Sequence, residues 1–199
     1  MTSTIIALEG ASGAGKTTIC TELLKRNPSW IGVYPTKFSR ESNIQTEIVS
    51  NSASDYIALS TAMSYPNATV ISDRGFLSHW VYEAYNYGSR RNWVSPFLQS
   101  IYNLEDLFHY EIISRWQNIP HIIERPNIHI LVIDPTYDQL MKQRNSTGKE
   151  YPHNELSLYR RMSLELYGNQ NDIHLKVSLI NWPIHVESLE TIITPISNQ

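Results

Sequence analysis

The chain has 199 residues, 41% of them hydrophobic, and a formal net charge of −3, which suits one domain, residues 1–199, with a sizeable buried core. The charge excludes a general basic surplus of the kind that binds nucleic acid, and no apolar run approaches the roughly 20 residues that cross a bilayer. The single cysteine, Cys20, excludes an internal disulfide, so we expect a protein of the reducing cytoplasm that has no membrane partner.

A short apolar run at residues 5–8 predicts a buried strand, and a glycine-rich segment follows it directly. Residues 10–17, GASGAGKT, match the pattern G-x-x-x-x-G-K-[ST], and a helical apolar spacing begins after them at Thr18. In the order strand, glycine loop and helix, backbone N–H groups of the loop and the helix N-terminus form a cradle for phosphate groups. We therefore expect an ATP-binding loop that consists of Gly10, Ala11, Ser12, Gly13, Ala14, Gly15, Lys16, Thr17 and Thr18.

Two side chains of this loop have the chemistry for metal-assisted phosphoryl transfer. Lys16 is expected to reach the β- and γ-phosphates of ATP, and the hydroxyl of Thr17 is expected to ligate Mg²⁺. The alternative is a flexible surface turn whose lysine is only solvated, and the flanking strand and helix disfavour it.

A second candidate site follows the apolar strand predicted at residues 69–72. Asp73 ends this strand, where a phosphate-loop enzyme needs a carboxylate near its metal, and Arg74 offers a planar fork for a phosphate oxygen. Taken alone, the two residues read more simply as a surface ion pair at a strand end. The glycine loop upstream favours the catalytic interpretation of both.

Further strands and helices alternate along the chain. The remaining strands are predicted at residues 30–34, 128–133 and 175–180, and the helices at 53–64, 76–86, 94–102, 104–116, 137–144, 155–167 and 186–193. This alternation predicts a three-layer α/β fold of the P-loop NTPase type, with a mostly parallel five-stranded sheet between helices. Ligands of such folds bind beyond the carboxyl ends of the strands, where the glycine loop and Asp73 both lie.

A polar loop at about residues 144–154 separates two of these helices. It begins at Arg144 and contains Lys149, so we expect a short lid that folds over the transferring phosphoryl group and excludes water. A solvated charged loop is the alternative, with nearly equal weight. In the next helix, one of Arg160 and Arg161 is expected to face the site and the other to be solvated.

The segment after the second strand, residues 33–42, is placed to meet an acceptor substrate. Lys37, Arg40 and Glu41 are candidates for charge contacts or base catalysis, although an ordinary polar loop is the better reading of each residue alone. Three aromatic residues after Arg74 have the shape to stack on a base, but core packing is their commoner role. These residues are Trp80, Tyr82 and Tyr85.

Several segments resemble those of one enzyme family. LEGASGAGKTT, residues 8–18, resembles the opening of thymidylate kinases and deoxynucleoside kinases, and DRGFLSHWVYEAY, residues 73–85, resembles the Asp-Arg-x-x-x-Ser segment of thymidylate kinases, with Ser78 at the serine. Residues 130–144 and 154–168 look like the strand into the lid helix and the helix after the lid. The resemblance covers most of the chain and implies a nucleoside monophosphate kinase-type fold. It also implies the phosphate, metal and lid roles for Lys16, Thr17, Asp73, Arg74 and Arg144.

Departures from this family lie on the acceptor side. Pro35 is followed by Thr36-Lys37, where thymidylate kinases usually have an arginine and often an acidic residue, and the predicted lid has fewer arginines than theirs. The identity of the acceptor is therefore the part of the function that the resemblance defines least.

Three functions stay open on the sequence. The first is an ATP-dependent phosphotransferase, thymidylate kinase-like, that moves the γ-phosphate to a nucleotide or nucleoside. The second applies the same chemistry to a hydroxymethylated base in DNA, as in viral relatives of these kinases, and places the protein in a host cytoplasm; its basic groove would contain Lys37, Arg40, Arg90 and Arg91. The third is an NTP-binding switch, although the sequence lacks the Asn-Lys-x-Asp motif of GTPases. A homodimer also stays open.

Overall fold

The computed structural model describes residues 2–35, 44–88, 92–115, 124–147, 154–169 and 174–193. Within these residues, the sheet has five parallel strands in the order β2-β3-β1-β4-β5. They are β1 (Thr4–Glu9), β2 (Ile31–Val33), β3 (Thr69–Asp73), β4 (Asn127–Asp134) and β5 (Leu175–Asn181). Each predicted strand is confirmed to within one residue at either end.

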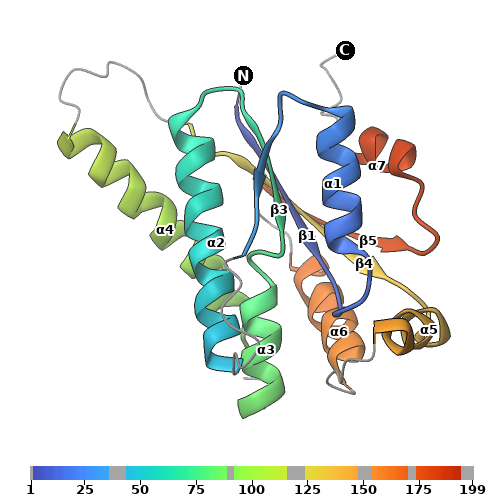
Figure 1. Ribbon diagram of the computed structural model, residues 1–199. Helices are drawn as coiled ribbons and strands as arrows, with labels where there is room; N and C mark the ends of the chain where they lie inside the picture. Colours follow the sequence, from blue (N-terminus) through green and yellow to red (C-terminus); the bar gives the residue numbers. More distant parts are fainter. Residues whose placement is uncertain are drawn as a thin grey trace.

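Helices cover both faces of this sheet, so the predicted three-layer α/β fold is confirmed. Figure 1 shows α1 and α7 together on one side of the sheet and α2 with α3 and α4 on the other. The helices are α1 (Lys16–Arg26), α2 (Ile44–Ser64), α3 (Ser78–Tyr87), α4 (Val94–Arg115), α5 (Tyr137–Thr147), α6 (Glu155–Tyr167) and α7 (Val186–Ile193). Among the described residues, none of these helices combines the length and the hydropathy that a membrane span requires.

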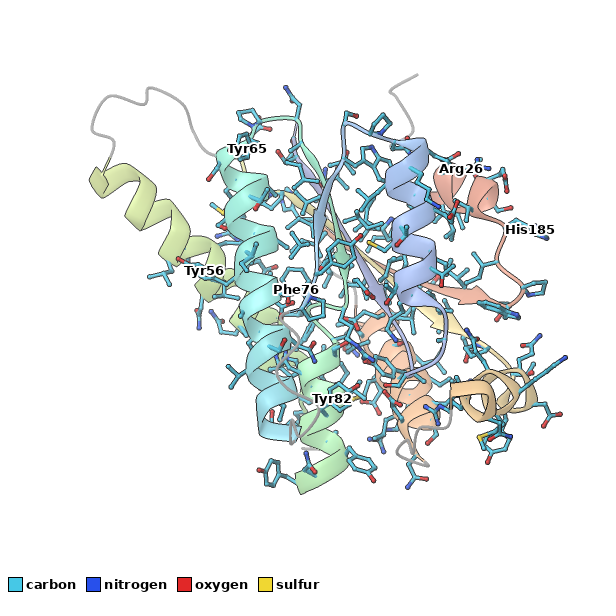
Figure 2. All side chains as sticks on the ribbon, in the orientation of Figure 1. Arg26, Tyr56, Tyr65, Phe76, Tyr82 and His185 are labelled. Carbon is cyan, nitrogen blue, oxygen red and sulfur yellow. The ribbon has the colours of Figure 1, made fainter. Side chains whose placement is uncertain are left out.

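The centre of the sheet explains why its strands read as continuous apolar runs. Residues 5–8 of β1 have no exposed surface, and residues 130–133 of β4 are at most 1% exposed. A strand in the middle of a parallel sheet is buried on both faces, so apolar residues occupy successive positions rather than alternate ones. Phe76, which follows β3, is also buried in this core beside α2 (Figure 2).

Some predicted helix boundaries are wrong. The helices expected at residues 94–102 and 104–116 are one helix, α4, because Asn103 fits inside it and its side-chain oxygen accepts a hydrogen bond from Gln99 one turn earlier, at 2.9 Å. Helix α2 begins at Ile44 rather than at residue 53. Its first half buries polar side chains, Ser50 and Asn51 among them, so the apolar period that marks a helix is missing there.

Candidate active site

The carboxyl ends of the central strands meet at one edge of the sheet. β1 pairs with β3 at Leu8 and Asp73 and with β4 at Glu9 and Val132, so the glycine loop after β1 lies beside the turn that follows β3. The backbone N–H of Arg74 in this turn donates to the carbonyl of Leu8 at 3.0 Å. The parallel register thus brings the loop of residues 10–17 and the Asp-Arg pair together.

The loop bends because its glycines hold backbone conformations that other residues rarely adopt. Gly10 has a φ of 133°, and a Cβ atom on it would lie 2.6 Å from the carbonyl oxygen of Ile133. Gly15 has a φ of 87° and is the N-cap from which α1 begins at Lys16. The N–H groups and the partial positive charge of a helix N-terminus favour anions, and here they stand at the end of the loop.

Lys16 is folded back into the loop. Its Nζ donates to the carbonyl of Gly10 at 2.6 Å and to that of Ala11 at 2.8 Å, and only 5% of the residue is exposed. Burial, together with the positive charge of Arg74, lowers the pKa of Lys16 to about 7. An ammonium group in so poorly solvated a place is stabilised by any anion that the loop binds.

Thr17 and Asp73 form an oxygen pair at the mouth of the loop. The Thr17 hydroxyl donates to Asp73 Oδ2 at 2.5 Å, and the Thr17 side chain is exposed whereas Asp73 is buried. Hydroxyl and carboxylate oxygens are the ligands that Mg²⁺ prefers, and this ion usually keeps waters and takes the rest of its ligands from substrate phosphates. Within the described ranges, no group of three or more His, Cys, Asp or Glu side chains gathers around a metal position.

Arg74 is held close to the loop by its backbone and its side chain. Its φ is 82°, an uncommon value for a residue other than glycine. One of its guanidinium nitrogens donates to the Ser12 hydroxyl at 3.0 Å and another lies 3.4 Å from the Tyr159 hydroxyl. The guanidinium carbon also lies 5.6 Å from the ring centre of Tyr82. Arg74 is therefore positioned beside the glycine loop rather than exposed at the surface.

Glu9 fixes the turn that carries Arg74, and sequence reasoning gave it no role of its own. Its Oε1 accepts N–H bonds from Gly75, Leu77 and Ser78 at 3.1, 2.8 and 3.2 Å, and its Oε2 accepts the Ser78 hydroxyl. Burial raises the pKa of Glu9 to about 7 although the bonds from Ser78 and Leu77 act in the opposite direction. An acidic residue at the end of an otherwise apolar strand was the signal that could have identified it.

The raised pKa of Glu9 predicts a pH-dependent stability. Between pH 4.5 and 7 the folded state holds the Glu9 proton more tightly than the unfolded state, so this group lowers the free energy of unfolding as pH rises, by up to about 3 kcal/mol. Glu9→Gln removes this contribution. Urea unfolding at pH 5 and pH 8 is expected to show the variant gaining stability relative to the parent at the higher pH. The variant Glu22→Gln, at an exposed position, serves as control. If the parent and Glu9→Gln differed in free energy of unfolding by the same amount at pH 5 and at pH 8, the assignment would be contradicted.

A buried carboxylate from α6 joins the loop to α5. Glu155 is 1% exposed, and its Oε1 accepts from the Ser12 N–H, the Ser12 hydroxyl and the Tyr82 hydroxyl at 3.0, 3.0 and 3.2 Å. Its Oε2 accepts from Arg144 at 2.7 Å, and Arg144 Nε donates to the carbonyl of Ser12 at 2.9 Å. Tyr82, which is labelled in Figure 2, is a residue of α3, and its hydroxyl links this helix to Glu155 at the start of α6. Sequence reasoning missed Glu155 because Ser12 is 143 residues away along the chain.

The geometry changes the expected place of Arg144. The sequence suggested a helix that ends near this residue and a lid that begins there, but α5 continues to Thr147. Arg144 is 6% exposed and lies under the glycine loop, where its guanidinium holds Ser12 and Glu155. Lys149 and the rest of the predicted lid, residues 148–153, lie outside the described residues.

The other candidates have mostly structural contacts. Arg160 donates to Asp134 at 2.5 Å and to the carbonyl of Pro135, and Arg161 lies 3.8 Å from Glu165 on the same helix.

Trp80 packs against the aromatic rings of Trp93 and Phe97, which is the core role expected for it. The Ser78 hydroxyl contacts Glu9 and Tyr159, Thr18 is exposed in the first turn of α1, and Tyr85 is 40% exposed. Residues outside the described ranges include Lys37, Arg40, Glu41, Arg90 and Arg91.

Comparisons with known proteins bear on the fold. No protein-family model and no curated protein sequence matches the chain. Among solved structures, a thymidylate kinase from Candida albicans is similar over 96% of this chain and 89% of its own, with a TM-score of 0.54 at 12% identity. A thymidylate kinase from Ehrlichia chaffeensis is similar over 96% and 98%, with a TM-score of 0.52 at 15% identity. A deoxyadenosine kinase from M. mycoides with bound dCTP is similar over 95% and 96%, with a TM-score of 0.51 at 15% identity. The chain thus has the fold of these kinases, as the sequence resemblance implied.

Proposed function

We propose that the protein is an ATP-dependent phosphotransferase, thymidylate kinase-like, that moves the γ-phosphate of ATP to a nucleotide or nucleoside. The observation that carries this proposal is the convergence of Lys16, the Thr17–Asp73 pair and Arg74 at the carboxyl edge of the sheet. The fold that the chain shares with thymidylate and deoxyadenosine kinases supports it.

In the proposed reaction the chain acts by positioning and by charge. The N–H groups of the loop hold the phosphates of ATP, and Lys16 exchanges its two carbonyl partners for phosphate oxygens. Thr17 and Asp73 would hold Mg²⁺, which supplies charge neutralisation when it is bound. Arg74 donates to the transferring group while an acceptor oxygen attacks it in line. Such a transfer needs little covalent chemistry from the protein, which agrees with a site made of cations, amides and oxygen ligands.

A transfer assay with γ-labelled ATP tests the proposal. The protein is incubated with Mg²⁺ and, separately, with each common nucleoside, each monophosphate, DNA that contains hydroxymethylated bases, and no acceptor. We expect label in one set of nucleosides or monophosphates and none without Mg²⁺. Label in DNA alone would replace the acceptor class, and release of inorganic phosphate alone would indicate an NTP-binding switch; either result contradicts the proposed function.

A further inference from the structure

The glycine loop is held from outside by side chains that meet at Ser12. Its N–H is taken by Glu155 and its carbonyl by Arg144 Nε, and its hydroxyl contacts both Glu155 and Arg74 at 3.0 Å. These partners come from α6, from α5 and from the turn after β3. One loop residue therefore receives contacts from two helices and from the turn after β3.

Glu155 is the centre of this arrangement. Its carboxylate accepts four hydrogen bonds, two from Ser12, one from Tyr82 and one from Arg144, and the ion pair with Arg144 has side chains that are 1% and 7% exposed. A buried ion pair contributes little net stability, because desolvation offsets most of its attraction, but it fixes geometry. The four donors are an N–H, two hydroxyls and a guanidinium, and together they bond to both carboxylate oxygens. A neutral side chain of similar shape has at most one acceptor oxygen that accepts without also presenting a donor, so it cannot replace both.

We propose that Glu155 is a positioning residue that holds Ser12 and Arg144, and through the Ser12 hydroxyl Arg74, in the arrangement that receives the phosphates of ATP. This inference rests on the proposed function only in that it takes ATP as the ligand. Glu155 acts through other residues, because its carboxylate bonds to the loop and to Arg144. In this proposal Arg74 and Arg144 are the cations that face the nucleotide.

Glu155→Gln tests this role with nearly the same shape. A carboxamide has one oxygen, so either the Ser12–Tyr82 group or Arg144 faces an NH₂ group instead of an acceptor. Calorimetric titration with Mg²⁺ and AMP-PNP, a nonhydrolysable ATP analogue, is expected to give a Kd about tenfold above that of the parent, the loss of one charge-assisted bond. Circular dichroism at the titration temperature is expected to show a folded variant, and the exposed Glu22→Gln is expected to bind as the parent does.

Chemical rescue provides a second readout that a purely structural role would not move. In Glu155→Ala, the four donors surround the position that the carboxylate leaves. Added formate is therefore expected to lower the Kd for AMP-PNP toward the parent value. Chloride at the same concentration is expected to leave this Kd unchanged. Formate is expected to leave Glu22→Ala unchanged. A Kd within twofold of the parent in Glu155→Gln, an unfolded Glu155→Gln, or no response of Glu155→Ala to formate would overturn the proposal.

These titrations separate this inference from the proposed function. If the parent binds AMP-PNP but transfers phosphate to no nucleoside or nucleotide, the acceptor assignment fails while the role of Glu155 is still decided by the Kd values. If the parent binds no AMP-PNP, both fail together. When transfer is observed, the positioning role further predicts a higher KM for ATP in Glu155→Gln, and a fall in kcat with unchanged KM would contradict it.

Discussion

Replacement of Lys16 by methionine is expected to lower kcat/KM for ATP by about a thousandfold, because the site loses the one ammonium group that lies inside the phosphate loop. Methionine has a similar length and flexibility, so the packing around position 16 stays filled. The charge is lost where little water can replace it, since Lys16 is 5% exposed. The free energy of unfolding should change little although the activity falls, because a buried cation with a pKa lowered to about 7 adds little to stability.

Consumption of ATP in the presence of the accepted nucleotide or nucleoside measures this effect. Lys25→Met is the matched control, since Lys25 lies on the same helix, is exposed and pairs with Glu22 at 2.7 Å. We expect the control to retain the parent rate. Activity of Lys16→Met within tenfold of the parent would show that the ammonium group does not serve the transferring phosphate.

Gly10→Ala is expected to destabilise the folded protein by about 4 kcal/mol, the second large effect that the structure predicts. The new Cβ would lie 2.6 Å from the carbonyl oxygen of Ile133 and 3.4 Å from its Cβ. Ile133 cannot withdraw cheaply, because it is buried in β4, which pairs with β1 on one side and with β5 on the other. The φ of 133° adds backbone strain for any residue with a side chain.

Urea unfolding of Gly88→Ala separates strain from collision. Gly88 also has a positive φ, 78°, but no atom of the described residues lies within 4 Å of a Cβ at this position. The control should therefore lose less, about 2 kcal/mol, the cost of the backbone conformation, since Gly88 also has a ψ of 151°. Equal losses of stability in the two variants would mean that the loop moves away from β4 without cost. That result would contradict the close packing of Gly10 against Ile133.

The sequence predicted best what depends on local pattern. Strands such as residues 5–8 and 130–133 are apolar throughout because neighbours bury both faces, and that signal needs no tertiary knowledge. The glycine loop was identified because its backbone conformations require glycine at fixed spacing, as at Gly10 and Gly15. Asp73 was placed correctly at a strand end because the apolar run at residues 69–72 stops there. It was expected near the glycine loop because parallel strands end at a common edge.

The sequence could not predict what depends on contacts between distant segments. Glu9 and Glu155 are ordinary acidic residues in the sequence, and only the fold shows that each carboxylate accepts several hydrogen bonds while buried. The place of Arg144 was missed because the end of α5 was expected three residues too early. The start of α2 was missed because buried polar residues, Ser50 and Asn51 among them, hide its helical period.

In the proposed function, the backbone amides of residues 10–18 hold the phosphates of ATP. A titration of the ¹⁵N-labelled protein with Mg²⁺ and AMP-PNP, followed by amide NMR, tests it directly. We expect the largest chemical-shift changes on the amides of Gly13, Gly15, Lys16 and Thr17, and we expect Lys16→Met to reduce these changes at equal ligand concentration. Saturable binding that leaves these amides unchanged would contradict it.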